Sequence, residues 1–145
     1  MDEVIRLFNA NHVRYLLIGG QAIRLEGMPR STMDWDFYIP PRDAVNMSRI
    51  QDLLGEQLDV PLVPLGPRGE NFVQTYQTKW GILQFHLAGP GLPSFDQAEK
   101  RAVLRNDADG LPVHCMCTDD LLDAKRKANR PRDQDDIFFL ENKKG

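Results

Sequence analysis

The stretch that decides the fold runs from Ile18 to Tyr38 and reads Ile-Gly-Gly-Gln-Ala-Ile-Arg-Leu-Glu-Gly-Met-Pro-Arg-Ser-Thr-Met-Asp-Trp-Asp-Phe-Tyr. Its first glycines, Gly19 and Gly20, come directly after an apolar run, which predicts a turn from a strand into a helix. Near its end, Asp34 and Asp36 lie in a second apolar segment, which predicts another strand. Because successive side chains of a strand point to opposite faces, we expect the two carboxylates to lie on the same face.

The residues around the two aspartates divide between the same two faces. Arg30 and Thr32 share the face of the carboxylates, whereas Met33, Trp35 and Phe37 have the other parity and are expected in the core. Two adjacent carboxylates repel each other unless water or a cation compensates their charge. A strand-to-helix turn also presents backbone N–H groups that suit a phosphate. The stretch therefore indicates a metal–phosphate site, and the simpler alternatives are a tight turn and an exposed strand face.

The composition limits the class of protein. A chain of 145 residues with 41% hydrophobic residues is expected to form one domain over residues 1–145. Its formal net charge of −3 argues against binding nucleic acid by bulk electrostatics. Cys115 and Cys117 are two residues apart, too close for an unstrained disulfide, and reduced thiols are typical of a cytoplasmic protein. No apolar segment approaches the roughly 20 residues of a membrane span.

Outside the opening stretch, hydrophobic periodicity predicts helices near both ends and strands in the middle. The expected elements are a helix from Asp2, a helix over 43–54, strands over 72–78 and 81–87, a helix after Ser94 extending toward Val103, a strand over 111–116, and helices over 119–128 and from Pro131. On the last helix, Ile137, Phe138 and Leu140 are expected to be buried. This order predicts an α/β (α+β) fold, a mixed β-sheet with helices packed mainly on one side.

Two segments together resemble a known family. Ile18-Gly-Gly-Gln-Ala22 followed by Arg30-Ser-Thr-Met-Asp34-Trp-Asp36 resembles the signature of the nucleotidyltransferase superfamily with a polymerase-beta-like core. This form is similar to the antitoxin-type proteins of abortive-infection systems and to small aminoglycoside and lincosamide nucleotidyltransferases. The segment from Asp120 to Leu140 resembles the C-terminal helix pair of the antitoxin-type proteins. The resemblance covers most of the chain and implies a minimal nucleotidyltransferase fold.

The resemblance also implies a reaction and a site. An acceptor hydroxyl would attack the α-phosphate of an NTP, with loss of pyrophosphate, and Asp34 and Asp36 would be catalytic residues that hold Mg²⁺. The residues that the resemblance assigns to the nucleotide are Gly19, Gly20, Gln21, Arg30, Thr32 and Lys125.

One strand departs from the family pattern. The family usually has a third carboxylate on a later strand, but the matching segment, 82–87, contains no Asp or Glu. Gln84 and His86 share one parity there, and His86 is the candidate general base. Three interpretations are open: an enzyme with a histidine base, a nucleotide binder with little activity, and an altered motif that keeps the fold for another role. His86 as a merely hydrogen-bonded strand residue is a further alternative.

The acceptor and the partners are less defined. The acceptor could be a small molecule, RNA or a protein, and a partner protein or a second copy in a homo-oligomer could supply the surface that binds it. An antitoxin-like role would instead require a toxin-like protein partner. We expect Asp133 and Asp136 to form structural ion pairs with Arg130 and Arg132 rather than a metal site.

Overall fold

The computed structural model describes residues 1–29 and 32–144. Within them lies one six-stranded mixed sheet with the strand order β3-β4-β2-β1-β6-β5. The strands are β1 (Leu16–Ile18), β2 (Asp34–Tyr38), β3 (Val73–Thr78), β4 (Gly81–His86), β5 (Val103–Asn106) and β6 (Pro112–Cys115). The predicted mixed α/β class is therefore confirmed.

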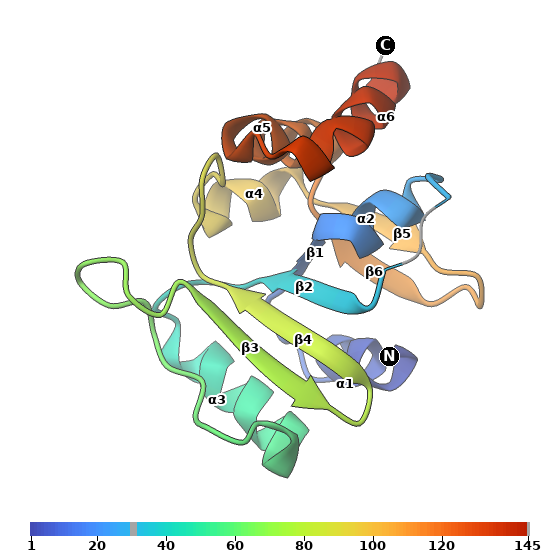
Figure 1. Ribbon diagram of the computed structural model, residues 1–145. Coiled ribbons are helices and arrows are strands. Elements are labelled where there is room, and N and C mark those ends of the chain that lie inside the picture. The colour runs from blue at the N-terminus through green and yellow to red at the C-terminus, as the bar shows by residue number, and fades with distance from the viewer. Residues whose placement is uncertain (30–31, 145) are drawn as a thin grey trace.

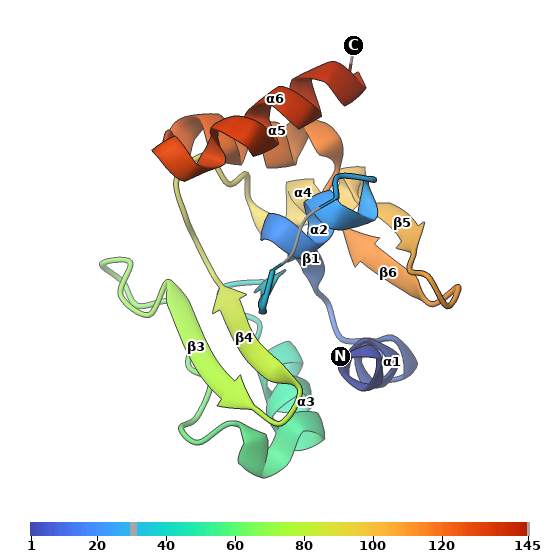
Figure 2. The same ribbon diagram turned by 45° about the vertical axis from the view of Figure 1, so that its right-hand side comes forward.

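Helices flank this sheet on both sides (Figure 1). The α-helices of the described chain are α1 (Asp2–Ala10), α2 (Gly19–Leu25), α3 (Ala44–Leu54), α4 (Phe95–Arg101), α5 (Thr118–Ala128) and α6 (Gln134–Lys144). Short 3₁₀ turns follow α3 at Gly55–Gln57 and precede α6 at Pro131–Asp133. Figures 1 and 2 show α1 and α3 below the sheet and α2, α4, α5 and α6 above it. Of the described helices, none is both long and apolar enough to cross a membrane.

The central strand β2 fixes the register of the site. It pairs antiparallel with β1 and parallel with β4. In the parallel pair, Asp36 lies opposite Gln84 and Tyr38 lies opposite His86. The predicted hairpin of β3 and β4 is also present, with Thr78 opposite Gly81 at its turn.

An aromatic cluster on the lower face holds the sheet against α1. The Phe37 ring lies 5.5 Å from Phe8 of α1 and 5.8 Å from Phe85 of β4, measured between centroids. Phe37 is fully buried, so its side chain and those of the two aspartates point to opposite faces, as β-strand alternation requires. On the upper face, Tyr38 packs edge-on against Phe95 of α4.

Two of the predicted core residues are in fact exposed. Met33 is 80% exposed because β2 begins only at Asp34, beyond the packed part of the strand. Phe138 is 72% exposed, whereas Leu140 is fully buried. Two residues correspond to about 200° around a helix, so the two side chains point in nearly opposite directions.

The sequence also gave no indication of β5. The helix after Ser94 was expected to continue to Val103, but α4 ends at Arg101 and the chain then forms an antiparallel hairpin with β6. Asp107 closes this hairpin, because its Oδ1 accepts hydrogen bonds from the backbone N–H groups of Asp109 and Leu111.

Candidate active site

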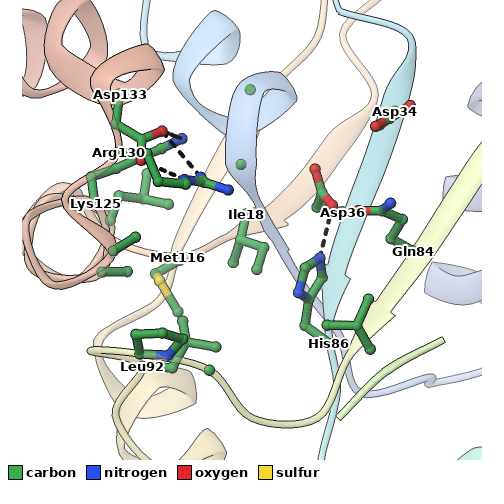
Figure 3. Close-up of a pocket in the computed structure, with 18 of the residues that line it drawn as sticks. Ile18, Asp34, Asp36, Gln84, His86, Leu92, Met116, Lys125, Arg130 and Asp133 are labelled. Carbon is green, nitrogen blue, oxygen red and sulfur yellow. Dashed lines mark hydrogen bonds and ion pairs between the residues drawn. The ribbon is translucent and has the colours of Figure 1, made fainter. Parts of the chain in front are cut away.

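A cavity of about 600 Å³ opens between the sheet and α5. This volume is within the range of pockets that take a small organic ligand. Figure 3 shows Asp34, Asp36, Gln84 and His86 on one wall and Lys125 with its neighbours on the other. The turn at the start of α2 lies between the two walls.

The sheet wall brings together four of the residues singled out in the sequence. Asp34, Asp36, Gln84 and His86 all line the cavity. Nε2 of His86 lies 2.8 Å from Oδ1 of Asp36, and both side chains are largely buried. The parallel pairing of β2 with β4 explains this contact, because it aligns alternate side chains of the two strands on one face.

The Asp36–His86 hydrogen bond also determines which ring nitrogen of His86 carries the proton and which carries the lone pair. An ionised carboxylate only accepts hydrogen bonds, so Nε2 of His86 is the donor. In the neutral ring the lone pair then belongs to Nδ1. In Figure 3 this second nitrogen is turned away from Asp36, toward the side of Ile18. The arrangement leaves one basic atom beside the carboxylate pair.

The glycine turn contacts the same carboxylate from another direction. Gly19 has a φ of +70°, a conformation that other residues rarely adopt. A Cβ atom added at Gly19 would lie 2.5 Å from Oδ2 of Asp36. The absence of a side chain therefore allows the backbone at the start of α2 to approach the carboxylate.

The opposite wall carries a buried network of charges. Nζ of Lys125 lies 3.1 Å from Oδ1 of Asp133 and 3.2 Å from Oδ2 of Asp136. Nε of Arg130 donates to Oδ2 of Asp133 at 2.7 Å. Burial alone would raise the pKa of Asp133, but the hydrogen bonds from Arg130 and Lys125 outweigh it and lower the pKa to about 2.

The ion pairing predicted for this segment is partly right. Asp133 does pair with Arg130, but Lys125 is the other cation of the network. Arg132 instead lines the cavity. The cluster of basic residues that follows Lys125 in the sequence was the only signal for Arg130 and Arg132 at this wall. The sequence alone did not show which of these basic side chains face the cavity, because that depends on where α5 ends.

The remaining predicted nucleotide residues differ in their placement. Gly20 and Thr32 line the cavity together with Gly19. Gln21 does not: it is buried, its Nε2 donates to the backbone oxygen of Thr32 and its Oε1 accepts from Arg24. In this structure the side chain of Gln21 joins α2 to the segment before β2 and does not face the cavity. Arg30 lies outside the described residues.

The donor set of the sheet wall suits a hard divalent cation. Two carboxylates and the amide oxygen of Gln84 line the same wall of the cavity, and oxygen ligands are what Mg²⁺ prefers. No third carboxylate joins them within residues 1–29 and 32–144. The only cluster of three acidic side chains in that part of the chain, Asp2, Asp107 and Asp109, lies elsewhere, at α1 and the β5–β6 turn.

Comparison with solved structures identifies the fold. The chain is similar to the solution structure of the antibiotic-resistance factor ANT(2'')-Ia, with a TM-score of 0.62 and 16% identity, over 99% of this chain and 81% of that chain. It is also similar to the crystal structure of ANT(2'')-Ia in complex with adenylyl-2''-tobramycin, with a TM-score of 0.64 and 14% identity, over 99% and 86%. No protein-family model and no curated protein matches the sequence. This chain therefore shares the fold of ANT(2'')-Ia, a mixed α/β, nucleotidyltransferase-like fold.

The close approach of Gly19 to Asp36 leads to a first prediction. Gly19→Ala should displace the Asp36 carboxylate and break its hydrogen bond with His86, which we would follow through the ¹⁵N chemical shifts of the His86 ring. Gly27→Ala is the matched control, because Gly27 also has a positive φ, +113°, but its added Cβ would meet nothing within 4 Å. Both variants should lose about 1–3 kcal/mol of stability. Equal shifts of the His86 nitrogens in the two variants would contradict the proposed contact.

The charge network on α5 and α6 leads to a second prediction. The lowered pKa of Asp133 stabilises the fold at every pH above the ordinary carboxyl pKa, and this contribution is lost as the pH falls toward 2. The shift from 3.8 to about 2 corresponds to about 2 kcal/mol. The free energies of unfolding of wild type and Asp133→Asn, measured with urea, should therefore differ clearly at pH 7. Near pH 2 this difference in free energy should be smaller by about 2 kcal/mol. Asp135→Asn, which changes an exposed carboxylate two residues further on, in the first turn of α6, should show no such narrowing.

Proposed function

We propose that the protein transfers a nucleoside monophosphate from an NTP to an acceptor hydroxyl in a Mg²⁺-dependent reaction. The observation that carries this proposal is the pair Asp34 and Asp36, which line the cavity side by side with Gly19 against Asp36. The adenylyl-2''-tobramycin bound to ANT(2'')-Ia supports the same class of reaction, because that compound bears an adenylyl group on an aminoglycoside.

Asp34 and Asp36 would hold the metal. When bound there, Mg²⁺ would offset the charge of the triphosphate and polarise the α-phosphoryl group. The backbone of Gly19 and Gly20 and the hydroxyl of Thr32 line the cavity close to this pair and are suited to contact phosphate oxygens. These residues would bind and orient the nucleotide, and positioning accounts for much of the barrier reduction in such transfers.

Lys125 would contact the phosphates from the opposite wall. Its side chain is only 13% exposed, and its ammonium group is held by Asp133 and Asp136. The two carboxylates compensate the cost of burying the charge and restrict the rotamers of Lys125. We infer that Asp133 and Asp136 position Lys125 and do not themselves bind metal.

In the reaction, the acceptor oxygen would attack the α-phosphorus. The bond from that phosphorus to the oxygen bridging toward the β-phosphate would break, and pyrophosphate would leave. The acceptor proton would pass to Nδ1 of His86, while Asp36 accepts the hydrogen bond from Nε2 and stabilises the imidazolium that results. His86 would thus do part of the work that the resemblance to the nucleotidyltransferase superfamily assigns to a third carboxylate.

The carboxylate pair provides the direct test. Asp34→Asn and Asp36→Asn should each reduce pyrophosphate release from NTP and Mg²⁺ by at least about a hundredfold, since each removes a charge that acts on the transition state. Asp123→Asn is the control, because this carboxylate is exposed on α5 and does not line the cavity. The assay should offer candidate acceptors of three classes: small molecules, RNA and proteins. If the wild type binds Mg·NTP but labels none of them, the transferase proposal is wrong.

A second candidate function is a nucleotide-binding protein with little or no activity, such as an antitoxin-like protein that acts by contact with a toxin-like partner. The observation that favours it is Gln84, which lies opposite Asp36 in register and offers a neutral amide. Loss of an anionic ligand weakens the binding of a second metal ion.

Three further expectations from the sequence remain predictions. They are an acceptor surface supplied by a homo-oligomer, a cytoplasmic location and a single domain over residues 1–145.

Two substitutions on β4 distinguish the candidates. In a working enzyme, Gln84→Glu should tighten Mg²⁺ binding and preserve or raise turnover, whereas His86→Gln should lower kcat by about 10²–10⁴ with little change in nucleotide affinity. In a binding protein, Gln84→Glu would still tighten Mg²⁺ binding, but neither substitution would change a rate, because no turnover would be detected with either form. Nucleotide affinity and turnover are therefore measured on the same samples.

A further inference from the structure

The charges that line the cavity carry information about the acceptor. Three carboxylates line it among the described residues, those of Asp34, Asp36 and Asp133. Asp133 is already engaged by Lys125 and Arg130, at 3.1 and 2.7 Å. The other two form the metal site of the proposed function. In this part of the chain, no lining carboxylate is therefore left to receive a cationic ligand.

The helix wall of the cavity also carries positively charged side chains. Lys125, Arg130 and Arg132 all line the cavity. Arg132 is exposed, and within residues 1–29 and 32–144 its side chain makes no hydrogen bond or ion pair, so its charge is uncompensated. Apolar side chains also line the cavity, among them Ile18, Leu92 and Met116 (Figure 3).

We propose that the acceptor is a neutral or anionic hydroxyl compound, and that the cavity excludes polycations such as aminoglycosides. This inference rests on the proposed function, because it assigns Asp34 and Asp36 to the metal. An aminoglycoside carries several amines that are protonated at neutral pH, and each one needs a carboxylate or water when it enters a protein site. The guanidinium of Arg132, which has no carboxylate partner among the described residues, would repel it further. In this respect the chain differs in ligand class from ANT(2'')-Ia, whose crystal structure contains adenylyl-2''-tobramycin.

Arg132 is the specificity residue that can be tested without disturbing the network. Arg132→Glu reverses one lining charge and breaks no hydrogen bond of the described chain. Arg126→Glu makes the same change of net charge on the neighbouring helix, outside the cavity, where the exposed Arg126 forms only a 3.5 Å ion pair with Glu141. Any non-specific attraction of a polycation to a more acidic protein should affect both variants alike.

The experiment titrates each protein with tobramycin and with fully N-acetylated tobramycin, which keeps the hydroxyls but has lost the amine charges. The titrations are done by calorimetry, with and without Mg²⁺ and a non-hydrolysable ATP analogue. For the wild type loaded with Mg²⁺ and the nucleotide analogue, we expect no tobramycin binding at about 1 mM. Arg132→Glu should bind tobramycin at least fivefold more tightly than Arg126→Glu does. The two variants should bind the acetylated compound with equal affinity.

Two results would overturn the inference. One is tighter binding of tobramycin than of its acetylated form by the wild type, or transfer of a nucleotide to tobramycin. The other is an equal response of Arg132→Glu and Arg126→Glu. Failure of the wild type to bind the Mg²⁺–nucleotide analogue would instead contradict the proposed function. The titrations without nucleotide would still report on the charge of the cavity, so the two failures can be told apart.

Discussion

The parallel pairing of β2 with β4 is the constraint on which the rest of the cavity depends. It puts Asp36 opposite Gln84 and brings His86 within 2.8 Å of the Asp36 carboxylate. A shift of one residue in this register would turn the side chains of one strand to the opposite face and separate these groups. The buried ring of Phe37, packed between Phe8 and Phe85, prevents that shift because its burial requires the present alternation.

The strand-to-helix turn adds a second constraint to the same carboxylate. Because Gly19 has no side chain, the start of α2 can lie directly against Asp36, and the backbone, the carboxylate and the imidazole meet at one point. The buried side chain of Gln21 contributes by holding α2 to the backbone of Thr32. The site is therefore organised by backbone geometry and strand register, and few of its side chains are free to move independently.

The opposite wall follows a different principle, since its charges are compensated within the protein. Lys125, Arg130, Asp133 and Asp136 form a network in which each carboxylate has a cation within about 3 Å. Such networks restrict the positions of their members when every charge has a partner. The result is an ammonium group of Lys125 held at the cavity wall, together with Arg132, whose side chain has no ion-pair partner among the described residues.

The sequence by itself determined the local features: the Gly-Gly turn, the two aspartates on one strand face, the β3–β4 hairpin and the mixed sheet with its helices. These follow from short-range periodicity, glycine conformation and strand alternation, which are readable over a few residues. Only the tertiary structure decided that Met33 and Phe138 are exposed, that Val103 begins a strand, and that Gln21 turns away from the cavity. It also decided that Lys125 pairs with Asp133 and Asp136 and that Nε2 of His86 meets Asp36. These outcomes depend on contacts between residues far apart in the chain, whose distances no local pattern encodes.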